Sequence, residues 1–158
     1  MSEGYVRKVR LCDIAPLAAD LRQADVAEIK AASGKTPEAA LYASLTLGGE
    51  TRVICLNDGT PVGIFGVVPT AKDLGGIWMV ATNQFQLLHR QFLRECHQEI
   101  DDLCKGYKAV FNCTDARNKV HHRWIKWAGF SIIKRHTSYG YEGREFLEFA
   151  KITGGRHV

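Results

Sequence analysis

The sequence predicts a mixed α/β (α+β) fold in which helices flank one sheet, and three observations support this prediction. Runs with period-two and helical spacing of apolar residues follow in the order β, three helices, β, β, β, α, β, α, β, β. The tetrapeptide Asn57–Thr60 contains Asp-Gly, a strong hairpin signal between two β-rich runs. The segment Asn118–Phe130 contains both start and stop signals of a helix.

The first third of the chain predicts one strand and three short helices. Val6–Leu11 alternates apolar and basic residues, which is typical of a half-buried strand. Helical patterns follow at about Ile14–Leu21, Asp25–Ala32 and Thr36–Leu47. Asp13 is an expected cap of the first helix, Ser33-Gly34 ends the second, and Pro37 occupies the first helical position of the third.

The middle of the chain predicts three strands and then the longest helix. Thr51–Leu56 and Pro61–Val68 flank the Asp-Gly turn, so we expect them to pair antiparallel. A further strand is expected at Gly76–Ala81. The helix follows the polar segment Thr82–Gln84, with apolar residues on one face from Phe85 to Leu103.

The last third predicts a strand, a well-delimited helix and two more strands. Ala109–Cys113 is a short apolar strand. Asn118 opens the next helix, and Gly129 supplies a left-handed stop. Its expected apolar stripe is Val120, Trp124, Trp127 and Ala128. Two final strands are expected at Phe130–His136 and Glu145–Ile152.

Length and composition indicate one globular domain. With 158 residues and 46% hydrophobic content, the chain can bury a core without disulfides or metals. We expect residues 1–152 to form this domain and residues 153–158 to form a polar tail. No run approaches the roughly 18 apolar residues of a membrane span, and the start of the chain lacks the apolar segment of a secretory signal. We therefore expect a soluble protein made in a cytoplasm.

The cysteines indicate reduced thiols rather than a disulfide framework, because their number is odd and most have apolar neighbours. They are Cys12, Cys55, Cys96, Cys104 and Cys113. A metal site is not predicted, since the offset from Cys96 to Cys104 is not a zinc-ligand spacing. Cys96 instead continues the apolar face of its helix.

A basic cluster raises the alternative of nucleic-acid binding. Its members are Arg117, Lys119, His121, His122, Arg123, Lys126, Lys134, Arg135 and His136. Trp124 and Trp127 interleave with them, as in a surface that stacks bases and binds phosphates. The net charge of +4 does not require such a partner, and a solvated helix face is the favoured interpretation.

The order of elements, together with Asn118, Gly129 and Phe130, resembles the Gcn5-related N-acetyltransferase (GNAT) superfamily. In that superfamily an asparagine opens the penultimate conserved helix and a Gly-Phe pair closes it. The chain is also similar to a narrower group, the small proteins of T7-like tailed phages related to an internal virion protein. That similarity rests on Trp78–Thr82, Asp115–Asn118, Arg123–Phe130 and Tyr141–Phe146.

The resemblance implies a mostly antiparallel sheet that splays between its fourth and fifth strands, with acetyl coenzyme A (acetyl-CoA) in the split. In active members a glycine-rich loop at a helix N-terminus holds the pyrophosphate. The corresponding loop, Thr82–Gln86, contains no glycine, and Phe85 would obstruct close backbone approach. If acetyl-CoA binds, the resemblance places beside it Val80, Thr82, Gln84, Gln86, Arg90 and Asn118.

The resemblance also implies a general acid, usually a tyrosine seven residues after the helix-opening asparagine. Ile125 occupies that position and cannot donate a proton. Candidates for a general base are suggested by chemical type alone, so no catalytic residue is assigned. These candidates are Glu28, His89, His121 and His122.

We therefore predict a GNAT-like bacteriophage protein that has lost catalysis, with no cofactor. It would serve as an internal virion or virion-assembly protein through protein–protein contacts with other phage structural proteins. It would be made in the host cytoplasm and could enter the virion. The alternative is an acetyl-CoA-dependent N-acetyltransferase with an atypical pyrophosphate loop.

Overall fold

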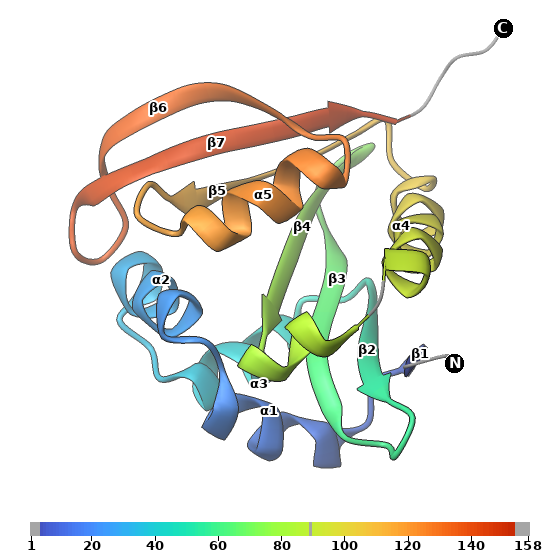
Figure 1. Ribbon diagram of the computed structural model, residues 1–158. Helices are drawn as coiled ribbons and strands as arrows, with labels where there is room; N and C mark the ends of the chain where they lie inside the picture. The colour runs from blue at the N-terminus through green and yellow to red at the C-terminus, as the bar shows by residue number, and fades with distance from the viewer. Residues whose placement is uncertain (1–3, 89, 154–158) are drawn as a thin grey trace, which may run out of the picture.

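One seven-stranded sheet organises the computed structural model, which describes residues 4–88 and 90–153. The strands are β1 (Gly4–Lys8), β2 (Glu50–Leu56), β3 (Pro61–Ala71), β4 (Leu74–Ala81), β5 (Ala109–Asp115), β6 (Ser131–Tyr139) and β7 (Arg144–Ile152). Their spatial order is β1-β2-β3-β4-β5-β7-β6. Every neighbouring pair is antiparallel except β4 and β5, which run parallel. The expected mixed fold is confirmed (Figure 1).

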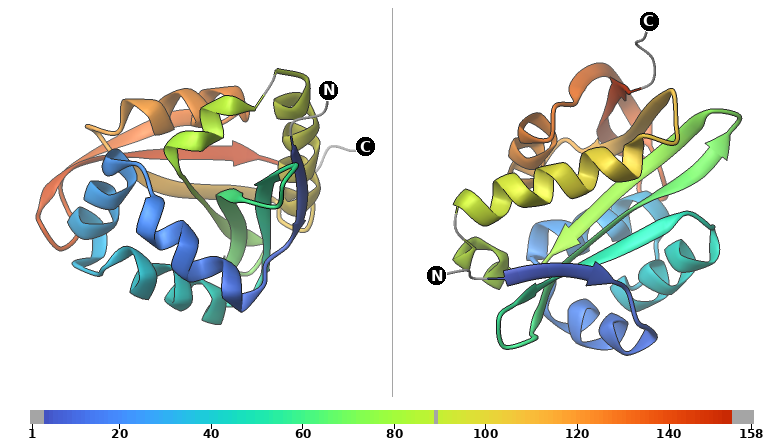
Figure 2. Two further views of the ribbon diagram at one scale, coloured as in Figure 1. Left: turned by 60° about the horizontal axis from the view of Figure 1, so that its bottom comes forward. Right: turned by 90° about the vertical axis from the view of Figure 1, so that its right-hand side faces the viewer.

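Helices cover both faces of the sheet (Figure 2). They are α1 (Ile14–Asp20), α2 (Gln23–Ser33), α3 (Pro37–Thr46), α4 (Arg90–Cys104) and α5 (Lys119–Trp127), with short 3-10 helices η1 (Leu11–Asp13) and η2 (Asn83–Leu87). Side chains alternate between the faces of a strand, so β3 sends Ile64 toward α1 and α3 and Phe65 toward α4 and α5. Two hydrophobic cores result, one on each face.

Strands β4 and β5 pair only at their beginnings and then diverge. The parallel register joins Leu74–Gly76 to Ala109–Phe111 and extends no further. At the point of divergence, the side-chain amide of Asn112 donates to the carbonyl oxygen of Ile77 at 2.6 Å. The later parts of the two strands lie apart, as Figure 1 shows. The split implied by the resemblance is therefore present, and we call it the β4–β5 gap.

The ends of some elements differ from the prediction. Strand β1 ends at Lys8, earlier than expected, and Asp13 does not cap α1. Its carboxylate instead accepts from the backbone N–H of Arg10 and pairs with Arg7 at 2.8 Å, which ties β1 to η1. The long helix α4 begins at Arg90, since the preceding residues form η2.

Helix α5 has the predicted ends but a different buried face. Asn118 accepts from the backbone N–H of His121, and Gly129 has a φ of 92°. The buried residues are His121, Ile125 and Ala128, spaced four and three residues apart. Ala128 is buried and Trp124 and Trp127 pack against the core, as expected, whereas Val120 is 37% exposed. The most buried face of the helix is therefore rotated from the expected stripe toward His121 and Ile125.

The five cysteines, all within the described residues, are free thiols, as the sequence predicts. Cys55, Cys96 and Cys104 are buried, while Cys12 is exposed. Among the described helices, none combines the length and the apolar character that crossing a membrane requires. His89 and most of the expected tail, residues 154–158, lie outside the described residues.

Candidate active site at the β4–β5 gap

The edge of β4 presents backbone groups to the β4–β5 gap. The carbonyl of Ile77 accepts from Asn112, and the N–H of Ala81 donates to Asp25 at 2.9 Å. Met79 lies between them, and alternation in an antiparallel ladder directs its N–H and C=O to the same side. This peptide edge can therefore pair with an extended ligand that lies in the gap.

A first cavity lies between η2 and α5, and we call it the η2–α5 cavity. Its volume is about 390 Å³. Thr82 and Gln86 line it on one side, and Trp124 lines it from α5. Arg22 and Arg123 also line it, so it combines an aromatic surface with two basic residues, of which Arg22 also pairs with Asp25 at 2.9 Å. Such a combination suits a ligand with anionic and planar groups.

A second cavity, the α2–α3 cavity, lies on the side of the gap covered by those two helices. Its volume is about 290 Å³. Its lining is largely apolar, with contributions from Trp78 and Val80 of β4 and from Phe146 of β7. Glu28 and His121 are polar residues in this lining. A mainly apolar cavity with a few placed polar groups is typical of a small-molecule site.

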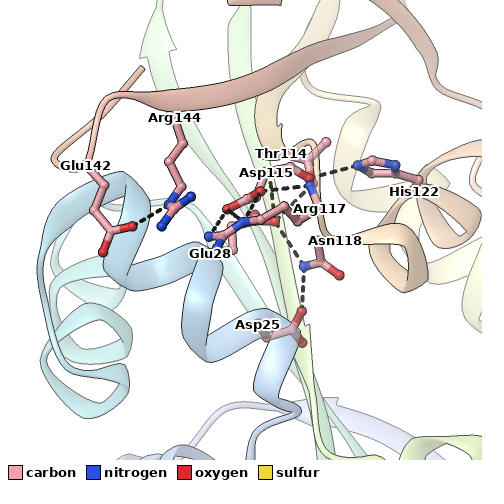
Figure 3. Close-up of polar contacts among 9 residues, drawn as sticks. All are labelled: Asp25, Glu28, Thr114, Asp115, Arg117, Asn118, His122, Glu142 and Arg144. Atoms are coloured by element: carbon pink, nitrogen blue, oxygen red, sulfur yellow. Dashed lines mark hydrogen bonds and ion pairs between the residues drawn. The ribbon is translucent and has the colours of Figure 1, made fainter. Parts of the chain in front are cut away.

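Glu28 is held at this cavity by three hydrogen bonds, shown in Figure 3. Its Oε1 accepts from the hydroxyl of Thr114 at 3.0 Å, from the backbone N–H of Asp115 at 3.1 Å and from Nδ2 of Asn118 at 3.0 Å. Burial of the carboxyl group raises the pKa of Glu28 from 4.5 to about 7, although these hydrogen bonds oppose the rise. At neutral pH the group can therefore both accept and release a proton.

Asn118 connects the start of α5 to two carboxylates of α2 (Figure 3). Its Nδ2 donates to Oδ1 of Asp25 and to Oε1 of Glu28, both at 3.0 Å, while its Oδ1 caps the helix. Asp25 is 2% exposed and also pairs with Arg22 at 2.9 Å. The sequence analysis predicted the cap but missed Asp25 and this connection, because no local signal links α2 to α5.

His121 is the second polar residue whose setting is unusual. It is 3% exposed, and its Nδ1 has no hydrogen-bond partner among the described residues. Burial lowers the pKa of His121 to about 4, so the imidazole is neutral at physiological pH. An unpaired buried nitrogen is costly, and a ligand in the α2–α3 cavity could supply the missing partner.

The structure separates the six residues that the resemblance placed beside acetyl-CoA. Thr82 and Gln86 line the η2–α5 cavity, whereas Val80 lines the α2–α3 cavity. Gln84 and Arg90 are exposed and belong to neither lining. Asn118 is buried and donates a hydrogen bond to Glu28.

The candidate bases are separated as well. Glu28 and His121 line the α2–α3 cavity, whereas the ring of His122 bonds to the carbonyl of Asp115 instead. His121 is therefore not part of the solvated helix face that was the favoured interpretation of the basic cluster. Ile125, at the usual position of the acid, is fully buried in the core.

Several members of the basic cluster are engaged in other contacts, in addition to His122. Arg117 pairs with Asp115 at 2.7 Å, His136 contacts Glu148 at 2.8 Å, and His121 is buried. Trp124 and Trp127 are partly buried and line the η2–α5 cavity. The segment therefore does not present all its cationic and aromatic side chains as one surface.

The chain is similar to solved protein structures. Neither a family model nor a curated protein sequence matches the chain. Ard1 from Thermoplasma volcanium is similar with a TM-score of 0.76 and 16% identity over 97% of this chain and 99% of that one. A GCN5-related N-acetyltransferase from Kribbella flavida has a TM-score of 0.67 and 17% identity over 95% and 98%.

A third similar structure contains the acyl donor. It is a phosphinothricin acetyltransferase from Sinorhizobium meliloti in complex with acetyl-CoA, with a TM-score of 0.68 and 11% identity over 96% of this chain and 89% of that one. At such identities the likeness establishes the fold. The narrower resemblance to phage internal virion proteins finds no support in these comparisons. The chain therefore has the fold of the GNAT acetyltransferases. Its fourth and fifth strands run parallel and then diverge.

Proposed function

We propose that the protein is an acetyl-CoA-dependent N-acetyltransferase with an atypical donor site. The observation that carries this proposal is Glu28, a carboxyl group with a pKa of about 7 that lines a cavity beside the β4–β5 gap. The fold supports it too, since a structural neighbour is a complex with acetyl-CoA. The expectation of lost catalysis depended on a missing glycine-rich loop and a missing general acid. Two arginines are candidates for the first function, and the chemistry below does not require the second.

The donor would extend along the edge of β4 and into the η2–α5 cavity. The N–H and C=O of Met79 would pair with amides of the pantetheine arm. Two amides of the loop are already engaged, because Gln84 donates to the hydroxyl of Thr82 and Phe85 donates to its carbonyl. We therefore assign the phosphates to Arg22 and Arg123 instead of a glycine-rich loop.

The acceptor amine would enter the α2–α3 cavity. Glu28 in its carboxylate form takes a proton from the ammonium, and the free amine attacks the thioester carbonyl carbon. The nitrogen of the tetrahedral intermediate releases its second proton to solvent, the intermediate collapses, the C–S bond breaks, and coenzyme A leaves as a thiolate. Because a thiol has a pKa of about 8.5, the thiolate is a good leaving group and can take its proton from solvent. Ile125 at the usual acid position is compatible with this chemistry.

The test compares Glu28→Gln with the wild type in acetyl-CoA binding and in acetylation of a panel of primary amines. Glutamine keeps the size of the side chain but cannot take the proton, so we expect turnover to fall by about 100-fold or more. Acetyl-CoA affinity should change little. Glu38→Gln, an exposed carboxylate on the neighbouring helix α3, is the matched control. Wild-type protein that neither binds acetyl-CoA nor acetylates any amine would overturn the proposal in favour of a non-catalytic role.

A further inference from the structure

Three potential metal ligands meet where β5, β7 and β6 lie side by side, at the edge of the α2–α3 cavity. They are Cys113 of β5, His136 of β6 and Glu148 of β7, and one ligand atom of each lies within 4.8 Å of the others. Cys113 is directly opposite Glu148 in the strand register, and His136 is opposite Phe146, two residues along the same strand. Side chains two apart share a face, so all three point the same way.

The three side chains of the cluster are partly buried, so solvent still reaches them. The side chains of His136 and Glu148 are 27% and 25% exposed, and Nε2 of the histidine lies 2.8 Å from Oε1 of the glutamate. Cys113 is a partly buried free thiol. Its thiol interacts with the hydroxyl of Tyr139. The imidazole therefore already has an oriented carboxylate beside it, and the thiol is reduced.

We propose that Cys113, His136 and Glu148 bind a zinc ion. A thiolate, an imidazole and a carboxylate are the ligand types that zinc prefers, and together they supply two negative charges. Ligand atoms about 2.0–2.3 Å from a tetrahedral ion are roughly 3.5 Å apart. The observed limit of 4.8 Å requires side-chain adjustments on the order of 1 Å, while the strand ladders hold the backbone in register.

Three protein ligands leave the fourth tetrahedral position for water or another small ligand. Cys113 and Tyr139 also line the α2–α3 cavity, so the ion would lie beside that cavity. None of the three ligands is among the residues assigned to acetyl transfer, and zinc binding does not depend on that function. The sequence analysis missed the site because its ligands come from three different strands and show no short spacing.

Zinc binding must displace the proton of the Cys113 thiol. A cysteine thiol has an ordinary pKa of about 8.5 and is therefore mostly protonated at neutral pH before the ion arrives. Binding should therefore release protons to the buffer, and the measured heat should depend on the ionisation enthalpy of the buffer. A carboxylate-only surface site would release none.

The experiment titrates the full chain, under reducing conditions, with Zn²⁺ by calorimetry and with Co²⁺ by absorption spectroscopy. We expect one equivalent to bind, with the thiolate-to-cobalt charge-transfer band of a Cys ligand. Cys113→Ser should weaken binding by roughly 100-fold and abolish the band. Cys12→Ser, which removes an exposed thiol elsewhere, should leave both unchanged.

A second variant separates loss of a ligand from loss of structure. Glu148→Gln keeps the size of the side chain and a hydrogen bond to His136 but removes the anionic ligand. It should therefore lower the affinity for Zn²⁺, while the circular dichroism spectrum stays as in the wild type. The proposal is overturned if wild-type protein fails to bind Zn²⁺ at micromolar concentrations, in which case the cluster is only a hydrogen-bonded pair beside a thiol. It is equally overturned if Cys113→Ser binds as tightly as wild type.

Discussion

Glu28→Gln should stabilise the protein, and the gain should grow with pH. The pKa of Glu28 is raised from 4.5 to about 7, so between these values the folded state holds a proton that the unfolded state has lost. Stability therefore falls as pH rises through this range. A difference of one bound proton changes the free energy of unfolding by about 1.4 kcal/mol per pH unit, so the total loss of stability reaches about 3 kcal/mol above pH 7. A neutral glutamine avoids this loss while the residue keeps its place beside Asn118.

The measurement is urea denaturation of wild type and Glu28→Gln at intervals from pH 5 to pH 8. The difference between the two proteins isolates Glu28, since the other titrating groups contribute equally to both. We expect the free-energy difference to grow by about 2–3 kcal/mol across the range. The exposed control Glu38→Gln should show no trend. A difference that stays constant with pH, or that shrinks, would refute the argument that Glu28 is protonated by burial.

Three further predictions concern α5 and the cavities. Asn118→Ala removes a cap and both hydrogen bonds to α2, so thermal unfolding should show a loss of about 2 kcal/mol or more; an unchanged melting temperature contradicts this. Arg123→Ala should weaken acetyl-CoA binding about tenfold in calorimetry, and Lys126→Ala on the same helix should not; equal effects would remove Arg123 from the donor site. His121→Phe removes a buried imidazole with a pKa of about 4, whose protonation destabilises the fold as pH falls from 6.5. The variant should therefore gain up to about 3 kcal/mol over wild type at pH 4 relative to pH 7, and a gain independent of pH would contradict the neutral state.

Local signals accounted for most of the elements. Thr36 and Pro37 start α3, and the turn at Asp58-Gly59 joins β2 to β3. Asn118 and Gly129 bound α5, as the sequence analysis expected. Each of these signals works because a side chain satisfies, or a glycine permits, backbone geometry within a few residues. Because these signals act over a few residues, the order of the elements could be predicted from the sequence.

The errors arose where the outcome depends on what packs against a segment. Phe85 fits a helical pattern, but it lies in η2, whose first turn is held by the hydroxyl of Thr82. His121 is polar and was assigned to the surface, yet its ring packs between Trp124 and Phe149. Packing against β7 therefore decided which face of α5 is buried, and a single helix pattern contains no information on that partner.

The sequence by itself determined the elements and their order, because those follow from short-range backbone chemistry and from the pattern of apolar residues. The GNAT-like split was implied by the family resemblance alone. Only the tertiary structure decided the site. Glu28 meets Thr114 and Asn118 across about 90 residues of chain, and its raised pKa comes from burial between α2, β5 and α5. Cys113, His136 and Glu148 likewise meet only when three strands align. Proximity and dielectric environment are properties of the folded chain, so neither site was visible in the order of its residues.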